Sequence, residues 1–311
     1  MSAARTNSER QVANGAAAGL YAFTSTVQGH EVSELQWATL GSAWSDQLWL
    51  WLLLAATLAL YLRGIVNLWR KADRKVGIHR WRVLTFMLGW LALVVAVLSP
   101  LDAMGNALFW AHMVQHEVLL LIAAPALVLG RPVAAMVWGL PVSWRRPAAT
   151  AAARSGLKAL SGLLTRPMTA WWVHAGALWI WHAPVLFEAA LAVQWIHDTQ
   201  HISFFVSALV FWWSLFHGPG ARPRYDIALL YVFTTAVHTS VLGALLTFSD
   251  RVLYQSYLQS APAWGLTALE DQQLGGLIMW VPGGLVYLGI GLVLFAAWLR
   301  DFDRRETARS I

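Results

Sequence analysis

The stretch "FWAHMVQHEVLLLIAAPALVLG", residues 109–130, carries the two features that decide how this chain folds. Its second half is continuously apolar, whereas its first half holds two histidines and a glutamate. About 20 apolar residues in a helix cross the hydrocarbon core of a bilayer, because a helix rises 1.5 Å per residue. Polar groups inside a membrane are costly and tend to mark function. The stretch therefore predicts a membrane helix whose polar end has a specific role.

Apolar runs of similar length recur along most of the 311 residues, of which 58% are hydrophobic and only 12% charged. We therefore predict an all-α, polytopic membrane protein with seven transmembrane helices. The predicted spans are residues 47–69, 81–98, 107–129, 168–182, 197–216, 226–248 and 275–299. They form one transmembrane domain, residues 47–300, between an N-terminal segment, 1–46, and a C-terminal tail, 301–311.

The positive charges predict the orientation of these helices. Most Lys and Arg lie in four segments, residues 70–82, 131–166, 222–224 and 300–309, which alternate along the chain with poorly charged or acidic connections. Cytoplasmic loops of membrane proteins are enriched in Lys and Arg. We therefore expect the N-terminal segment to be extracytoplasmic, the C-terminal tail to be cytoplasmic, and membrane lipids to surround the helices.

The composition also excludes several kinds of site. The chain has no cysteine, so disulfides, thiolate metal sites and dithiol redox chemistry are excluded. Nothing resembles a catalytic domain, a phosphate-binding loop or a nucleic-acid-binding module. We expect neither an enzyme nor a nucleic-acid partner.

Seven polar residues fall near the predicted outer surface. Two pairs with the spacing H-x-x-x-H open spans three and five, and residues four apart lie on one helix face, about 5–6 Å apart at Cβ. A further histidine closes span four, another lies in the outer half of span six, and an aspartate begins span seven. The candidate metal ligands are His112, His116, His182, His197, His201, His238 and Asp271.

Imidazole suits zinc, copper, iron and nickel, and Met113 and Met279 are possible additional ligands at the same depth. A metal or haem site is one interpretation of the histidines. A hydrogen-bonded polar network or a proton relay between helices is the other. Asp271 also fits the N-cap of span seven, and Glu117 fits either a partner that orients an imidazole or a hydrogen bond to a neighbouring helix.

Small residues and prolines predict how the helices pack. Gly275 and Gly276 permit a neighbouring helix to approach closely, and Pro125 predicts a bend in span three on the cytoplasmic side of its histidines. Pro184 interrupts the outer end of span four, because helices tend to stop before a proline.

The segments "FWAHMVQHEVLLLIAAPALVLGRP", "WIWHAP", "HDTQHISFFVSALVFWW" and "DQQLGGLIMW" occur in this order across the seven spans. In this the chain resembles the caa3-type cytochrome c oxidase assembly factor family (CtaG). The resemblance implies a seven-helix protein of the bacterial inner membrane that helps assemble a haem-copper oxidase by handling copper on the outer face. The positions that it carries over are His112, His116, His182, His197, His201 and Asp271, with Gln272 and Gly276 beside them.

His238 is a candidate from topology and not from the resemblance, and Glu117 stands where an apolar residue or methionine is expected in many relatives. The resulting hypothesis is a non-enzymatic factor whose outer histidine cluster holds copper transiently. Its expected partners are an oxidase subunit and a soluble copper donor on the outer face.

Two other functions fit the same residues. Histidines on facing helices can be axial ligands of haem, in an electron-transfer or haem-handling protein. A metal or proton transporter needs a path to the inner surface, for which His174 is the one plausible next step.

Overall fold

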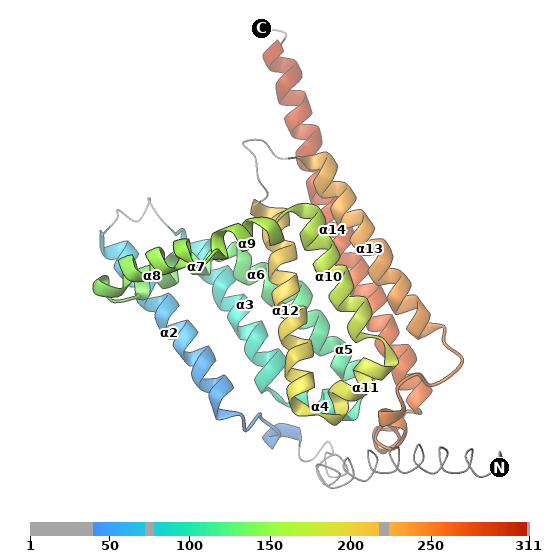
Figure 1. The fold of residues 1–311 in the computed structure, drawn as a ribbon. Coiled ribbons are helices and arrows are strands. Elements are labelled where there is room, and N and C mark those ends of the chain that lie inside the picture. The colour runs from blue at the N-terminus through green and yellow to red at the C-terminus, as the bar shows by residue number, and fades with distance from the viewer. Residues whose placement is uncertain (1–39, 72–77, 218–223, 310–311) are drawn as a thin grey trace, which may run out of the picture.

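The computed structural model describes residues 40–71, 78–217 and 224–309. These residues form helices joined by short connections, with no strand among them (Figure 1). The long helices are α2 (Leu48–Lys71), α3 (Arg80–Leu98), α5 (Phe109–Glu117) continued by η2 (Val118–Ala123) and α6 (Ala124–Leu129), α10 (Pro167–Trp181), α12 (Gln194–His217), α13 (Tyr225–Thr247) and α14 (Ala268–Arg309). The shorter ones are η1 (Leu40–Ser42), α4 (Pro100–Ala107), α7 (Pro132–Gly139), α8 (Val142–Arg154), α9 (Leu157–Leu164), α11 (Pro184–Ala192), η3 (Gln255–Leu258) and η4 (Ala261–Trp264).

Six helical segments within these residues are long and apolar enough to cross a membrane, and they correspond to six of the seven predicted spans. The fourth predicted span is the first arm of a bent pair, α10 and α11, which meet at 74°. The last span begins earlier than predicted, at Ala268, and its helix continues without a break to Arg309. The all-α membrane architecture is therefore confirmed, with the fourth span as a broken element.

Pro184 causes the break between α10 and α11. Proline disfavours helical backbone in the residue before it, and Ala183 is extended, with φ −62° and ψ 128°. Proline also favours the first turn of a helix, where no backbone N–H is needed, and Pro184 begins α11. His182, the C-cap residue of α10, lies at this turn and is buried.

The segment α5–η2–α6 is the centre of the bundle, since 61% of its span is buried, the largest share among the six spans. At Pro125, where the sequence predicts a bend, η2 forms a π-helical turn, in which Ala124 N–H bonds to the carbonyl of Leu119. In the same pattern the backbone nitrogen of Pro125 would donate to the carbonyl of Leu120. Proline has no N–H, so this carbonyl receives no hydrogen bond from Pro125. The indole N–H of Trp212 on α12 donates to that carbonyl instead, at 2.7 Å.

Helices α13 and α14 pack closely through two glycines that face each other. A Cβ on Gly276 would lie 2.6 Å from the backbone N of Thr247 and 2.8 Å from the carbonyl O of Gly243. These distances are too short for any side chain, so the two helices approach as small residues permit in membrane bundles. The close approach expected at Gly275 and Gly276 is confirmed, and Gly275 additionally lies against the ring of Phe109.

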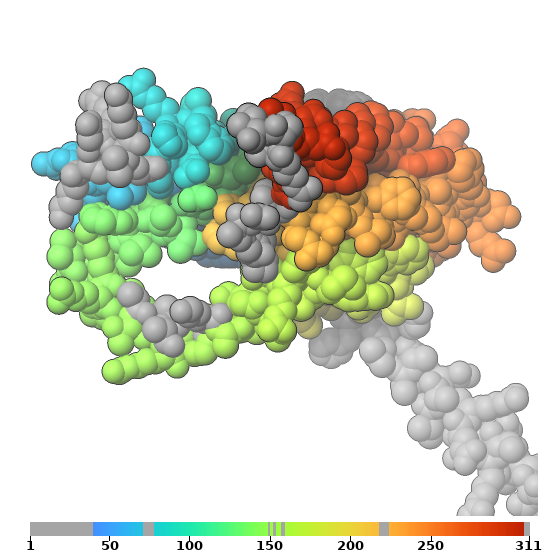
Figure 2. All heavy atoms as spheres, turned by 90° about the horizontal axis from the view of Figure 1, so that it is seen from above, coloured from blue at the N-terminus to red at the C-terminus, as the bar shows by residue number. Residues whose placement is uncertain are grey.

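The ends of the helices that flank the basic segments lie together at the top of Figure 1, where α7, α8 and α9 run across the bundle and α14 projects beyond it. The opposite end carries α4, α11 and the connection between α13 and α14. Helices α7–α9 form an arc at the edge of the first end, and Figure 2 shows an open gap between this arc and the rest of the bundle.

We expect Gly276→Ala to lower the free energy of unfolding in detergent micelles by about 1–3 kcal/mol, because α13 and α14 must separate to admit the methyl group. Gly289→Ala is the matched control on the same helix, since a Cβ there meets nothing within 4 Å. It should be neutral or slightly stabilising, because alanine favours a helix more than glycine does. Equal effects of the two substitutions would contradict this account of the packing.

Candidate metal centre

Five of the predicted ligands come together between three helices. They are His112 and His116 of α5, His197 and His201 of α12, and His182 at the C-terminal end of α10. The ring centroids are 4.4 Å apart for His112 and His116, 4.2 Å for His197 and His201, 5.4 Å for His112 and His197, 5.2 Å for His116 and His201, and 5.9 Å for His116 and His182. We call these five residues the histidine cluster. All five are buried, with at most 8% of each side chain exposed.

Hydrogen bonds to backbone carbonyls fix two of the rings. His182 Nδ1 donates to the carbonyl of Leu178 at 2.7 Å, and His112 Nδ1 lies 3.3 Å from the carbonyl of Gly105. When Nδ1 carries the proton, Nε2 of a neutral imidazole has a free lone pair. A ring held in this way is the usual arrangement of a histidine that binds metal through Nε2.

The Nε2 atom of every histidine in the cluster is buried and has no hydrogen-bond partner among the described residues. Leaving one polar atom unpaired in an apolar interior costs on the order of 1–3 kcal/mol. A cation bound by several of these rings would satisfy their nitrogens together. No hydrogen bond joins two rings of the cluster among the described residues, although His112 Nδ1 also lies 3.4 Å from the Tyr257 hydroxyl.

The ligand atoms fall into two groups, within each of which all atoms lie within 4.8 Å of one another. The first group is His112, His116 and His201, and the second is Asp102, His197 and His201. We call them the inner triad and the outer triad. Nitrogen ligands of zinc lie about 2.0–2.1 Å from the ion, so ligand atoms at these separations reach one ion after small side-chain shifts.

Asp102 is the functional candidate that the sequence analysis missed. It lies in the first turn of α4, half-buried, and its Oδ1 accepts a hydrogen bond from Gln115 Nε2 at 2.7 Å. The same amide nitrogen donates to the carbonyl of Ala96, also at 2.7 Å. Burial raises the pKa of the Asp102 carboxyl, while the nearby His197 and the hydrogen bond from Gln115 partly counteract that rise. A cation beside this carboxylate would offset the cost of its burial.

Asp271 has a role other than those expected for it. Its two carboxylate oxygens accept hydrogen bonds from the backbone N–H groups of Phe109, at 2.7 Å, and Trp110, at 3.0 Å. It therefore caps α5 and not its own helix, which is capped by Thr267 and Glu270 through reciprocal hydrogen bonds. Asp271 belongs to neither triad. The sequence correctly predicted that Asp271 caps a helix, but the helix that it caps is α5 and not α14.

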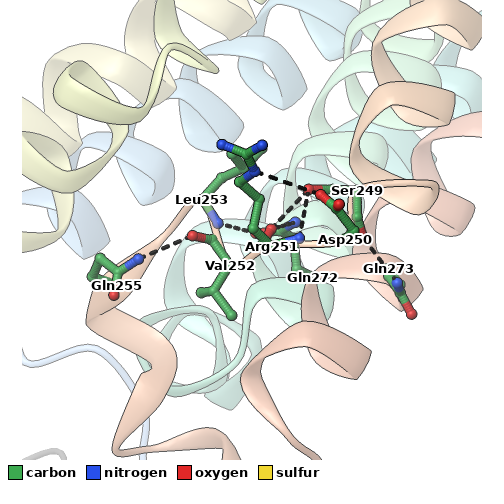
Figure 3. Close-up of polar contacts among 8 residues, drawn as sticks. All are labelled: Ser249, Asp250, Arg251, Val252, Leu253, Gln255, Gln272 and Gln273. Atoms are coloured by element: carbon green, nitrogen blue, oxygen red, sulfur yellow. Dashed lines mark hydrogen bonds and ion pairs between the residues drawn. The ribbon is translucent and has the colours of Figure 1, made fainter.

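The connection between α13 and α14 contacts the residues around the cluster. Gln272 holds it, because Gln272 Oε1 accepts from Leu253 N at 2.6 Å and Gln272 Nε2 donates to the carbonyl of Arg251 at 3.2 Å (Figure 3). Figure 3 also shows Gln273 Nε2 donating to the carbonyl of Ser249, at 3.0 Å. Gln272, which the family resemblance marked, thus fixes the shape of this connection.

Two tyrosines from this connection reach the cluster. The Tyr254 hydroxyl donates to the carbonyl of His182 at 3.0 Å, and the Tyr257 hydroxyl donates to the carbonyl of Gly105 at 2.9 Å. Burial raises the pKa of Tyr257 well above its ordinary value, so its hydroxyl stays protonated as a donor. Both tyrosines position the residues around the histidines.

His238 does not join the histidine cluster. Its ring lies against Trp171, with centroids 5.2 Å apart, and it belongs to neither triad. Of the two methionines considered as additional ligands, Met113 is fully buried in the hydrophobic core. Met279 lines a small cavity beside His116.

That cavity also contains the side chain of Glu117. It measures about 20 Å³ and is lined by His116, His182, Glu117, Thr239, Met279 and Tyr287, among others. Such a volume holds about one water molecule. Glu117 Oε2 has no hydrogen-bond partner among the described residues, and the nearest part of α14 is Gly283, where a Cβ would lie 3.3 Å from that oxygen. The glutamate therefore faces the same space as two rings of the cluster.

Comparison with protein families gives one match over most of the chain. The family described as cytochrome c oxidase caa3 assembly factor matches residues 59–301. All five histidines of the cluster, Asp102 and Asp271 lie within the matched part.

Similar proteins occur in mycobacteria. An uncharacterized protein of Mycobacterium bovis and one of Mycobacterium tuberculosis are each 30% identical to this chain over 261 residues, and one of Mycobacterium leprae is 26% identical over 260 residues. Each alignment covers 80% of this chain but 38% of the relative, so the chain spans well under half the length of these proteins. No solved structure matches the chain.

We expect Asp271→Asn to lower the free energy of unfolding by about 1–3 kcal/mol, because a neutral amide replaces a carboxylate that accepts two hydrogen bonds at a buried helix terminus. Asp303→Asn makes the same change at an exposed position near the other end of α14 and should leave the stability nearly unchanged. Unfolding in mixed micelles, followed by tryptophan fluorescence, measures both variants. If Asp303→Asn costs as much as Asp271→Asn, the cap on α5 is not the source of the stability.

Proposed function

Because the chain belongs to the cytochrome c oxidase caa3 assembly factor family, we propose that it binds copper at the histidine cluster and presents the ion to a subunit of the oxidase. Copper is the cargo of this function and not a resident cofactor. The single observation that supports the proposal most is the proximity of five buried histidine rings, whose Nε2 atoms have no hydrogen-bond partner among the described residues.

The chemistry of these ligands fits a copper ion. Imidazole binds copper well, and a site without thiolates holds it less tightly than the cysteine sites of storage proteins. Delivery needs such a moderate site, since an incoming ligand from the acceptor must displace one from the carrier. Five rings within reach of one another offer more ligands than one ion requires, so that one ring can leave while others remain bound.

The packing of the rings favours an ion over haem. The rings of His112 and His116 meet edge to face, at 82°, and the rings of His116 and His201 do so at 83°. A metal ion fits among such rings after small shifts, whereas a porphyrin between two axial ligands would have to force the helices apart. The haem-binding alternative therefore has less support from the geometry.

We also propose that the cluster lies in the outer leaflet of a bacterial plasma membrane, where a soluble copper donor can reach it. The basic connections at the opposite end of the bundle support this orientation through the positive-inside rule. Figure 1 places α7–α9, with Arg145, Arg146 and Arg154 on α8, at the end remote from α4 and α11.

The His112→Ala, His116→Ala double variant tests the site. We expect its copper affinity to fall about 100-fold or more, since removal of even an outer partner of a ligand costs 10–100-fold. Copper retained by the purified protein after dialysis against a chelator measures the loss, and copper content of the oxidase in the same cells measures delivery. His238→Ala is the control, because it removes a half-buried histidine outside both triads. Undiminished retention in the double variant would refute the proposed site.

The absence of cysteine allows a direct test of the orientation. We expect a cysteine at position 259, introduced as Gln259→Cys in the connection between η3 and η4, to react with a membrane-impermeant maleimide in intact cells. A cysteine introduced as Ala151→Cys on α8 should react only after the membrane is permeabilised. Both positions are exposed in the structure, so the reagent reaches either one from its own side. The reverse pattern of labelling would overturn the orientation.

A further inference from the structure

The two triads share His201 but differ in accessibility and in ligand chemistry. The inner triad adds His112 and His116, whose side chains are 0% and 2% exposed. The outer triad adds His197, 4% exposed, and Asp102, which is half-buried. The inner triad therefore offers three nitrogens in a closed environment, and the outer triad offers two nitrogens and an anionic oxygen closer to the surface.

The shared histidine limits how the triads are used. Both groups take one ligand atom from the ring of His201. Two cations beside one shared ring would repel each other, so the triads are alternative positions for one ion rather than independent sites. The rings that differ between them are close, since the centroids of His112 and His197 are 5.4 Å apart, as are those of His112 and His201.

We propose that the triads are successive positions of a copper ion on its way into the protein, with Asp102 as the first ligand that it meets. This inference rests on the proposed copper function and assigns to Asp102 a ligand role that the histidine cluster alone does not require. The carboxylate attracts a cation to the outer triad, and the ion then moves to the inner triad without ever leaving His201.

The transfer is a ligand exchange in which the copper keeps its oxidation state. Bonds from the ion to the carboxylate of Asp102 and to His197 break, and bonds to Nε2 of His112 and of His116 form. No electron, proton or further reactant is needed. The ion is never without protein ligands, because its bond to His201 persists through the exchange.

Gln115 prepares Asp102 for this role. It lies on α5 between the two histidines of the inner triad, and its side-chain nitrogen holds Asp102 Oδ1 at 2.7 Å. The hydrogen bond uses one of the two carboxylate oxygens. Because Gln115 is also anchored to the carbonyl of Ala96, the carboxylate is fixed relative to α3 and α5 before any ion arrives. Such preorganisation favours rapid capture.

The test compares the rate of copper binding with its extent. Copper(II) ions alone are mixed with the full-length protein in detergent, and the quenching of tryptophan fluorescence is followed by stopped flow. We expect Asp102→Asn to slow association about 10-fold or more, in the range by which charge steers small ions. The copper retained at equilibrium should stay at the wild-type level, because the inner triad is intact. His197→Ala should also slow association, because it removes another ligand of the outer triad.

The controls separate capture from retention. Asp250→Asn removes an exposed carboxylate of the connection between α13 and α14, outside both triads, and it should leave the association rate within about 2-fold of wild type. His116→Ala should do the opposite of Asp102→Asn, with rapid initial binding but at least 10-fold less copper retained. Asparagine can still accept the hydrogen bond from Gln115, and unchanged thermal unfolding of Asp102→Asn would confirm that its fold is intact.

The outcomes distinguish this inference from the proposed function. If Asp102→Asn changes neither rate nor extent while His116→Ala loses copper, the successive positions are refuted and the copper site stands. Complete loss of retained copper in Asp102→Asn would also refute them, because the two triads would then be one site. If neither variant affects copper, both proposals fail.

Discussion

The carboxylate of Asp271 holds the start of α5 and thereby the whole histidine cluster. The first N–H groups of a helix have no partner within it, and at a buried terminus they must find one elsewhere. For α5 that partner lies 162 residues further along the chain, on α14. Because α5 begins at a fixed point on α14, the rotation of the helix is set, and His112 and His116 face α12. The ring of Phe109 against Gly275 completes this contact.

A second constraint acts at the other end of the same segment. The π-helical turn frees the carbonyl of Leu120, and Trp212 of α12 binds it. Helix α12 therefore meets this segment twice, once through His197 and His201 and once through Trp212. Two such contacts fix both the depth and the rotation of α12 relative to α5. The hydrogen bond of Trp212, which involves no histidine, thus helps to bring the four histidines of these helices together.

The sequence predicted the parts of the site that depend on local geometry. Pairs four residues apart on a helix share a face in any fold, so the two H-x-x-x-H pairs could be recognised with no knowledge of packing. The depth of each residue in the membrane also followed from the spans. His238 shows what depth alone leaves out, since its direction around α13 turns it toward Trp171.

The residues that could not be predicted act across long stretches of chain. Asp102 precedes the first histidine pair in a short helix whose placement follows from packing, and its bond to Gln115 gives no periodic signal. The partner of Asp271 is equally hidden, because an aspartate in a first helical turn normally caps its own helix. Hydrogen bonds between residues far apart in the sequence are thus the part of this fold that a single sequence does not reveal.

Helix α14 has a length that the membrane alone does not explain. Its 42 residues extend about 63 Å at 1.5 Å per residue, about twice the hydrocarbon thickness of a bilayer. The part of the helix beyond the apolar layer includes its charged C-terminal turns, where Arg305 pairs with Asp301. The aspartate that clamps α5 lies near the other end of the same helix. Helix α14 thus links the charged turns at one end of the bundle directly to the residues that hold the histidine cluster near the other end.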